Sequence, residues 1–225
     1  MSGFFGAFIE VLTNNNVLFY LIAYLVGGIP FGLFLTKTFY NIDVRTIGSG
    51  SIGATNVYRA IKGINPKNAT ILAVSTIVLD ACKGMFVVLA AKICGLSFET
   101  QWLIAILSIL GHCYSPYLGF NGGKGVSTAI GSVILLIPIE GVLGLVVWGF
   151  VGKVLKVSSL SSLFGVLSGI LLTFIVPYVL PIPDSINILA QVHTHTPVVI
   201  IGLLILYTHI PNIKRLLSGK EGKVL

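Results

Sequence analysis

The chain has 225 residues, of which 55% are hydrophobic and only 9% charged, and its mean hydropathy is +0.99. Soluble domains carry about 25% charged residues, so too few polar side chains remain to coat a water-facing globule of this size. The net charge of +7 is not gathered in a soluble basic module, which argues against nucleic acid; we predict one domain, residues 1–225, embedded in a lipid bilayer.

Apolar segments of membrane-spanning character recur along the chain. The N-terminal segment lacks a basic region and a small-residue cleavage site, so we expect no removable signal peptide. About 20 apolar residues cross a bilayer as a helix. The fourth and fifth segments are shorter, with Pro138 and Glu140 at the turn between them. They either form a pair of helices that enters the bilayer only to a shallow depth or cross it where it is locally thin. The pattern predicts an all-α bundle of seven transmembrane helices at Val17–Tyr40, Ala69–Ala91, Trp102–Leu118, Val126–Ile139, Gly141–Leu155, Ser161–Leu180 and Pro197–Ile213.

Basic residues separate to one side of this predicted topology. With the N-terminus outside, twelve of the fourteen Lys and Arg residues fall on one side, and Lys83 lies inside the second span. An excess of Lys and Arg marks cytoplasmic loops, so we predict an outside N-terminus and a cytoplasmic C-terminus. The opposite side carries Lys92 and the acids Glu10, Glu99, Glu140 and Asp184.

The first predicted cytoplasmic loop contains a glycine-rich segment, Arg45–Arg59. Gly48, Gly50 and Gly53 match GxGxxG, but without a βαβ unit around them this is not a dinucleotide fingerprint. Glycines let backbone N–H groups approach an anion closely, and arginines match phosphate geometry. The segment is either an anion-binding loop or a flexible loop that caps a helix at Val57. Its neutral donors are Ser49, Ser51, Thr55 and Asn56.

A second glycine-rich segment, Gly-Gly-Lys-Gly at residues 122–125, opens the apolar run that begins at Val126. It resembles a Walker A motif only superficially, because Gly125 stands where Ser or Thr should follow Lys124, and Leu118 stands at the first glycine position. A helix N-terminus still offers unpaired N–H groups and about half a positive charge. The segment is therefore either an anion site or an interfacial loop with a snorkelling lysine.

Polar residues also gather at two predicted cytoplasmic helix ends. His209 and Asn212 are three residues apart and would share a helix face that points toward the loops. His209 is either a buried hydrogen-bonded side chain or part of a site, and Lys214 and Arg215 are either topology anchors or site cations. A hydroxyl cluster opens the sixth span, as a helix cap or as further phosphate donors: Ser158, Ser159, Ser161 and Ser162.

Within the second span, Asp80 and Lys83 are spaced i, i+3. Each alone would cost about 2.5–3.5 kcal/mol at a helix centre, so we expect a mutual pair facing the bundle interior, structural or catalytic in role. Only Asp43 and Glu221 are acids on the predicted cytoplasmic side, a poor supply for a two-metal centre. The histidines at 193–195 are expected to lie in a solvated loop rather than bind metal. We predict no metal and no cofactor.

Three cysteines, Cys82, Cys94 and Cys113, lie in or near apolar segments and form no CxxC motif. Their odd number and surroundings favour buried small hydrophobic side chains over disulfides or ligands.

Together these segments resemble the bacterial acyl-phosphate-dependent glycerol-3-phosphate acyltransferase family, integral membrane enzymes of phospholipid synthesis. Each motif alone is weak, but their order and spacing are specific and cover nearly the whole chain. The family is a seven-span bundle with its N-terminus outside and its site at the cytoplasmic face. The motifs are Tyr24–Gly32, the Gly-Ser-Gly and Gly-Ala-Thr-Asn loop, Asp80-x-x-Lys83-Gly84, Gly-His with Gly-Gly-Lys-Gly-Val, Ser159-Leu-x-Ser162, and His209-x-x-Asn212-Ile-x-Arg-Leu with Gly-x-Glu221.

The resemblance implies transfer of an acyl group from a fatty acyl phosphate to the 1-hydroxyl of sn-glycerol 3-phosphate, giving 1-acylglycerol 3-phosphate and inorganic phosphate. Acyl-CoA and acyl carrier protein are not direct donors in this family. The expected location is the bacterial cytoplasmic membrane, with the site facing the cytoplasm and a monomer favoured.

A transporter for a phosphorylated solute is the main rival function. The phosphate sites lie on one face only, and no ladder of cations runs through the spans, which argues against transport. A scaffolding protein would leave the glycine–cation loops unexplained.

The resemblance also implies the residues of the site. Either His209 or a phosphate oxygen accepts the proton of the hydroxyl, and the resemblance favours the phosphate oxygen. The family usually has Asn where this chain has Ser51. The implied catalytic residues are Ser49, Arg59, Lys124, His209 and Asn212. The implied substrate-binding residues are Arg45, Gly48, Gly50, Ser51, Gly53, Thr55, Asn56, His112, Gly122, Gly123, Gly125, Ser159, Ser162 and Glu221.

Overall fold

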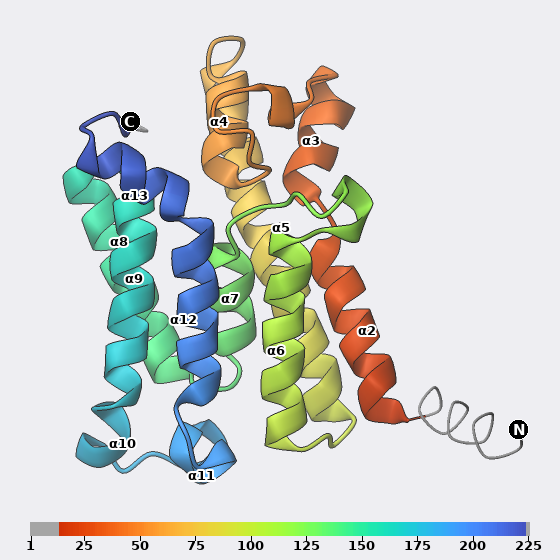
Figure 1. Ribbon diagram of the computed structural model, residues 1–225, viewed down its shortest axis with the longest axis vertical. Helices are drawn as coiled ribbons and strands as arrows, with labels where there is room; N and C mark the ends of the chain where they lie inside the picture. Colours follow the sequence, from red (N-terminus) through yellow and green to blue (C-terminus); the bar gives the residue numbers. More distant parts are fainter. Residues whose placement is uncertain (1–13, 224–225) are drawn as a thin grey trace, which may run out of the picture.

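The computed structural model of the chain describes residues 14–223, and every regular element in that range is helical (Figure 1). The all-α prediction is confirmed for this range. The signal-peptide prediction and Glu10 fall outside the described residues.

The N-terminal half of the described chain contains the longest helix. The first apolar segment, Asn15–Tyr40, is broken at Ile29 and Pro30 into α2 (Asn15–Gly28) and α3 (Phe31–Tyr40), because proline has no N–H and disfavours a helical residue before it. The 28-residue helix α5 (Pro66–Ile93) begins at Asn65, whose side chain caps it. Ser97 caps α6 (Phe98–Cys113) in the same way.

The remaining helices have 4 to 18 residues. α12 and α13 meet at His209 with a bend of 57°. The helices are α4 (Ala54–Ile61), α7 (Val126–Val133), α8 (Pro138–Leu155), α9 (Ser158–Thr173), α10 (Val176–Val179), α11 (Ile188–Val192), α12 (Thr196–Thr208) and α13 (Ile210–Leu217), with 3-10 turns at Val44–Thr46, Pro116–Leu118 and Asp184–Ile186.

Within residues 14–223, three helical segments are long and apolar enough to cross a membrane, with Asn15–Tyr40 counted as one, or four if the bent α12–α13 pair counts as one span. All seven predicted segments contain helix, but three of these helices end well before the predicted residue. The one expected over Ser161–Leu180 ends at Thr173, and the separate helix α10 follows it. The helix expected over Val126–Ile139 ends at Val133, and the one expected over Trp102–Leu118 ends at Cys113. Eight residues in α7 give a helix of about 12 Å, far short of the ~30 Å hydrocarbon core. The count of seven spans stays a prediction.

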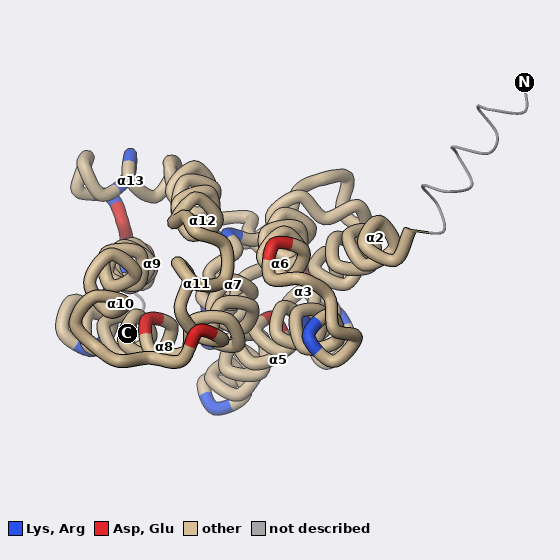
Figure 2. Tube along the Cα trace, turned by 90° about the horizontal axis from the view of Figure 1, so that it is seen from below, with Lys and Arg blue, Asp and Glu red and all other residues tan. Residues whose placement is uncertain are grey.

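Close helix pairs build the bundle. Figures 1 and 2 show α8 and α9 on one side, α2, α5 and α6 on the other, and α7 and α12 between them. In each of three pairs, a Cβ added to a glycine would meet the backbone of the partner helix, so the pair can pack only without that side chain. These glycines are Gly27 and Gly111 between α2 and α6, Gly84 and Gly131 between α5 and α7, and Gly144 and Gly165 between α8 and α9.

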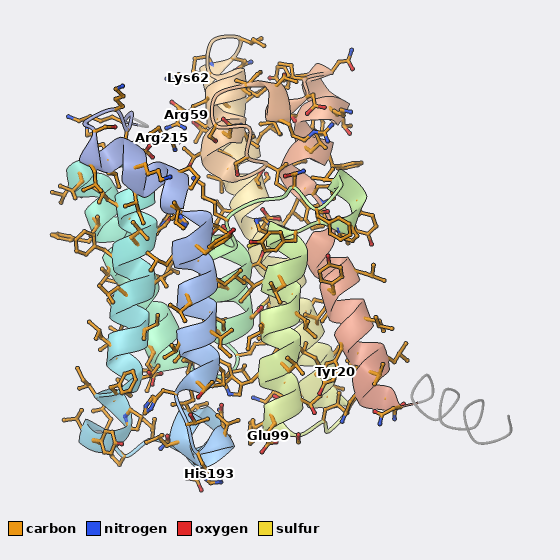
Figure 3. The ribbon with its side chains drawn as sticks, in the orientation of Figure 1. Tyr20, Arg59, Lys62, Glu99, His193 and Arg215 are labelled. Carbon is orange, nitrogen blue, oxygen red and sulfur yellow. The ribbon has the colours of Figure 1, made fainter. Side chains whose placement is uncertain are left out.

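The two ends of the bundle differ in charge. Arg59, Lys62 and Arg215 lie at one end, whereas Glu99 and His193 lie at the other (Figure 3). Figure 2 looks onto the second end and shows acidic positions there on α6 and α8. Basic residues therefore gather at the end where the glycine-rich segments lie, which is the arrangement that the topology prediction requires.

The cysteine prediction is correct in part. Cys113 is buried, but Cys82 and Cys94 are exposed, and all three are free thiols. Cys82 lies four residues from both Val78 and Phe86 on an outward-facing apolar stripe of α5. In a bilayer, an outward-facing helix surface is as hydrophobic as a buried one, so the sequence pattern does not distinguish the two.

Candidate functional site

A cavity of about 210 Å³ opens at the basic end of the bundle and continues between helices. Its lining comes from the glycine-rich loop, α7, α8, α9, α12 and α13, so residues far apart in the sequence meet there. The polar lining residues are Ser49, Ser51, Thr55, Asn56, Arg59, Asp80, His112, Lys124, Ser127, Glu140, Ser158, Ser159, Ser162, His209, Asn212 and Glu221.

Three helix N-termini point their unpaired backbone donors toward this cavity. Gly53 precedes α4, Gly125 precedes α7 and Val157 precedes α9, and none of the three ends has a side-chain cap. The first residues of all three helices line the cavity. Free N–H groups at a helix start carry partial positive charge, so three of them around one space favour an anion.

Two cations add full charge. Arg59 and Lys124 both line the cavity, and within residues 14–223 neither has a carboxylate within 4.0 Å. The pKa of Lys124 is lowered to about 8, mainly by burial. The positive charges of Arg215 and Arg59 also lower this pKa, and the negative charge of Glu221 only partly opposes the shift. The lysine backbone is fixed, because Thr208 Oγ1 donates to its carbonyl oxygen at 3.0 Å. The site is electropositive before any ligand binds.

Asn56 shapes the glycine-rich loop from within. Its Nδ2 lies within 2.9 Å of the carbonyl oxygens of Val44, Ile47 and Ser51, and its Oδ1 accepts from the Ser49 N–H at 3.2 Å. The side chain is 2% exposed. Its donors are therefore used by the loop, which turns through the left-handed conformation at Gly48 and Gly50. Ser49, Ser51 and Gly53 then line the cavity.

The hydroxyl cluster joins the loop to α9 instead of capping the helix. Thr55 Oγ1 and Ser158 Oγ are 2.8 Å apart, and Ser161 donates to the Val157 carbonyl within the helix. The cap at α9 is Val157, which has no side-chain hydrogen bond. The helix-cap alternative is thus not realised, and the N–H groups of α9 stay free for a ligand.

Glu221 ties the C-terminal segment to the site. Its Oε1 accepts from Ser159 Oγ at 2.8 Å and from Asn212 Nδ2 at 2.6 Å, and its Oε2 accepts from Arg215 Nε at 2.6 Å. Burial alone would raise the pKa of Glu221, but these hydrogen bonds outweigh burial and lower it. A carboxylate would repel a bound phosphate, so its contacts indicate that it orients Asn212 and Ser159.

His209, at the bend between α12 and α13, is 1% exposed and lines the cavity. Its Nδ1 lies 2.8 Å from the Ile205 carbonyl oxygen. Because a carbonyl can only accept, Nδ1 carries a hydrogen, and in the neutral ring Nε2 is left as an acceptor. His209 is therefore a buried hydrogen-bonded histidine that also lines the cavity, and its role in a functional site stays a prediction.

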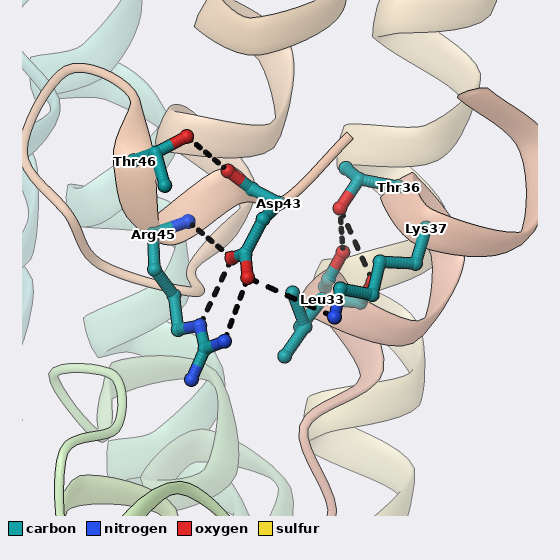
Figure 4. Close-up of polar contacts among 7 residues, drawn as sticks. Leu33, Thr36, Lys37, Asp43, Arg45 and Thr46 are labelled. Carbon is teal, nitrogen blue, oxygen red and sulfur yellow. Dashed lines mark hydrogen bonds and ion pairs between the residues drawn. The ribbon is translucent and has the colours of Figure 1, made fainter. Parts of the chain in front are cut away.

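Several residues expected in the site do not line the cavity. The Arg45 guanidinium forms two hydrogen bonds with the Asp43 carboxylate, at 2.9 and 2.6 Å (Figure 4). The side-chain hydrogen bond from Arg45 holds the pKa of Asp43 far below its usual range. The structure therefore places Arg45 outside the cavity with its charge already paired. The other residues outside are Gly48, Gly50, Gly122 and Gly123, which shape the two loops from behind.

A buried charged cluster supports the Gly-Gly-Lys-Gly loop. Lys83 Nζ lies 2.8 Å from Asp80 Oδ1 and 2.9 Å from His112 Nδ1, which confirms the predicted pair and adds a histidine to it. The backbone N–H of Gly123 donates to the His112 carbonyl at 2.9 Å. A Cβ at Gly123 would collide with the His112 ring. The cluster thus lies directly behind the loop that presents Lys124.

The apolar part of the cavity was missed in the sequence. It continues from the cations between α7, α8, α9 and α12, lined by aliphatic side chains and by glycines of α8 and α9. The spacing of these glycines on α8 and α9 was the available signal. An electropositive mouth joined to a long apolar cavity fits a ligand with an anionic head and a hydrocarbon tail. The lining of the inner part includes Ile130, Val133, Gly141, Gly144, Leu145, Gly165, Val166, Gly169 and Ile170.

Comparison with known proteins identifies a family. The model of the family described as glycerol-3-phosphate acyltransferase matches residues 17–219. A protein of Helicobacter hepaticus called glycerol-3-phosphate acyltransferase is 64% identical over 99% of each chain. Proteins of the same name from Helicobacter pylori and Wolinella succinogenes are 57% and 50% identical, over 98% and 99% of their lengths and 96% and 95% of this chain.

Two solved structures have the same fold. Both are crystal structures of PlsY (YgiH), described as an integral membrane glycerol 3-phosphate acyltransferase, one in a glycerol 3-phosphate form and one in a lysophosphatidic acid form. Each is 32% identical to this chain, with TM-scores of 0.77 and 0.75. The alignments cover 93% of this chain and 96% and 95% of those chains.

Proposed function

The chain belongs to the glycerol-3-phosphate acyltransferase family, and on that premise we propose that it transfers an acyl group from a fatty acyl phosphate to the 1-hydroxyl of glycerol 3-phosphate. The products are 1-acylglycerol 3-phosphate and inorganic phosphate. This would be the first acylation step of phospholipid synthesis.

One observation carries the proposal. Three uncapped helix N-termini and the cations Arg59 and Lys124 surround the mouth of a cavity whose interior is apolar. Both substrates carry phosphate and one also carries a long hydrocarbon chain, so the arrangement suits two anionic heads at the mouth and one tail inside. Holding two repelling anions together is the main task of such an enzyme, and positioning with fixed positive charge supplies it.

The proposed chemistry requires only groups already in the site. The 1-hydroxyl oxygen attacks the acyl carbon, a new C–O ester bond forms, and the bond from the acyl carbon to the phosphate oxygen breaks. Phosphate leaves with the bonding electrons, and a phosphate oxygen takes the hydroxyl proton. Arg59, Lys124 and the helix N–H groups stabilise the charge that develops on the oxygens. Asn212, held by Glu221, and Nε2 of His209 orient the glycerol hydroxyls.

We further propose seven membrane spans, with the N-terminus outside, the C-terminus in the cytoplasm and the site facing the cytoplasm. The gathering of Arg59, Lys62 and Arg215 at the end of the bundle that holds the site supports this orientation (Figure 3). Single cysteines placed at Lys62 and at Lys92, in a background without native cysteines, test it. An impermeant thiol reagent should label only the Lys92 position in intact cells, and labelling of the Lys62 position would refute it.

A transporter for a phosphorylated solute is the rival function. Purified protein in lipid vesicles is supplied with hexadecanoyl phosphate and radiolabelled glycerol 3-phosphate. We expect labelled 1-acylglycerol 3-phosphate and equimolar phosphate, and no product when hexadecanoyl-CoA replaces the acyl phosphate. Accumulation of unmodified glycerol 3-phosphate inside the vesicles without transfer would favour transport and overturn the proposal.

A further inference from the structure

A carboxyl group lies in the otherwise apolar part of the cavity. Glu140, in the first turn of α8, lines the cavity and is 1% exposed. Both of its carboxyl oxygens are buried and have no hydrogen-bond partner within the described chain. The helix dipole makes an acid tolerable in the first turn, but buried polar groups without partners are rare and need a reason.

The position of Glu140 along the cavity indicates that reason. Ser159 at the polar mouth and Gly169 both line the cavity and lie ten residues apart on α9. This spacing corresponds to about 15 Å along the helix, about half of the ~30 Å hydrocarbon core and thus the depth of one lipid leaflet. A Cβ at Gly169 would lie 3.7 Å from the Glu140 carbonyl oxygen, so Glu140 lies next to this far end.

Between the two ends, the lining suits a hydrocarbon chain. Gly141, Gly144 and Leu145 of α8 and Val166 and Ile170 of α9 all line this part of the cavity, and none of them carries a polar side-chain group. An acyl chain entering from the cations would run along this surface and end near Glu140.

We propose that Glu140 is the end stop of the acyl-chain site and disfavours acyl chains longer than the cavity; this rests on the proposed function. A chain that ends before Glu140 leaves the space beside its buried carboxyl unfilled. A longer chain presses a methyl group against this unpaired carboxyl and offers it no hydrogen bond, which is unfavourable for the complex.

Glu140→Leu tests the proposal, because leucine keeps the bulk and removes the polar group, and Glu140→Ala also adds room. The measurement is kcat/KM for dodecanoyl, hexadecanoyl, octadecanoyl and eicosanoyl phosphate. We expect the ratio of eicosanoyl to dodecanoyl transfer to rise roughly tenfold in both variants, the scale on which a pocket discriminates by a methylene. Transfer of the dodecanoyl chain, which does not reach Glu140, should stay at the wild-type level.

The matched control is Glu99→Leu. Glu99 also lies in the first turn of a helix, at the end of the bundle away from the cations, but it is exposed and does not line the cavity (Figure 3). This variant should keep the wild-type chain profile. An unchanged ratio in Glu140→Leu and Glu140→Ala overturns the proposal. If both variants lose dodecanoyl transfer, Glu140→Asp, which retracts the carboxyl by one methylene, should still shift the profile toward longer chains, and a wild-type profile there overturns it.

A binding readout separates this proposal from the reaction itself. Nonreactive dodecyl and eicosyl phosphate are added to the purified proteins and the shift in Tm is measured. Eicosyl phosphate should stabilise Glu140→Leu more than wild type, whereas dodecyl phosphate should stabilise both equally. If stabilisation depends on chain length but the wild type transfers no acyl group, the end stop is retained and the proposed reaction is rejected. If the wild type transfers the acyl group but eicosyl phosphate stabilises both proteins equally, the reaction is retained and the end stop is rejected.

Discussion

Thr55 and Ser158 are 103 residues apart in the chain, yet their hydroxyl oxygens lie 2.8 Å apart. This contact joins the first turn of α4 to the first residue of α9, and thereby fixes two of the three helix N-termini relative to each other. The site depends on that distance, because both ends must present their N–H groups to the same ligand.

Removal of this contact should weaken the site moderately. A neutral hydrogen bond contributes about 1 kcal/mol, so we expect Thr55→Val and Ser158→Ala each to lower kcat/KM about three- to tenfold. The double variant should lose little more than either single one, with a coupling energy of about 0.5–3 kcal/mol in a double-mutant cycle. Thr46→Val is the control, since Thr46 donates to the Asp43 carbonyl outside the cavity. Strict additivity of the two single effects would contradict the bridge.

The two arginines of the glycine-rich segment should behave differently. Arg59 lines the cavity without a carboxylate partner, whereas Arg45 is paired with Asp43. Hydrogen bonds to charged groups are worth about 1.5–3 kcal/mol, so Arg59→Ala should lower kcat/KM for glycerol 3-phosphate roughly 10- to 150-fold. Arg45→Ala is its matched control and should change kcat/KM less than about threefold. Equal losses in the two variants would show that the pairing of Arg45 is broken when substrate binds.

Loss of the Glu221 carboxylate should release the side chains that it holds. In Glu221→Ala, Asn212 and Ser159 lose their acceptor, and we expect kcat/KM to fall at least about tenfold. The lowered pKa of Glu221 means that its stabilising effect is present above the ordinary pKa of glutamate and is lost as pH falls through the lowered value. The Tm of the wild type should therefore fall more on acidification than the Tm of the variant. Glu99→Ala serves as control, and an equal fall in its kcat/KM would refute the specific role.

The charge on Lys124 should govern the alkaline side of the pH profile. With a pKa of about 8 in the free protein, the ammonium loses its proton as pH rises, and kcat/KM for glycerol 3-phosphate should decline above about pH 8. In Lys124→Arg, the arginine stays protonated throughout this range. The alkaline decline in kcat/KM should therefore disappear or move to much higher pH in this variant, whatever its absolute activity. An alkaline limb of unchanged position in this variant would assign the titration to another group.

The choice of proton acceptor can be tested at His209. If a phosphate oxygen accepts the proton, His209→Gln should retain kcat within about tenfold, because glutamine still offers a hydrogen-bond acceptor to the glycerol. If His209 is the general base, the loss should reach about 10²- to 10⁴-fold. His195→Gln is the control, since that ring stacks on Phe174 and binds the Thr173 carbonyl outside the cavity. A single-turnover measurement of the acyl-transfer rate separates the two cases.

Much of the fold followed from hydrophobic pattern and charge. Long apolar runs can only be helices in lipid, since backbone groups there must bond within their own segment, and the helices α5 and α8 are found within three residues of the predicted bounds. Periodicity could not show that α7 stops at Val133, because an apolar run continues through the following turn. It also could not distinguish the outward face that carries Cys82 from a buried one.

The candidate site divides in the same way. Glycines, cations and helix starts are local features, so the loop around Arg59 and the loop that presents Lys124 could be identified as anion sites from residue types and spacing alone. Which of these residues is free to bind depends on distant partners. The Asp43 carboxylate pairs with Arg45, and the loop carbonyls accept hydrogen bonds from Asn56. Glu221 accepts hydrogen bonds from Asn212 and Arg215. The apolar part of the cavity forms only where α7, α8, α9 and α12 come together. Composition and spacing thus determined the chemistry the chain carries, and tertiary packing decided which groups stay unpaired, since each donor or charge can satisfy only the partners that the fold brings within a few ångströms.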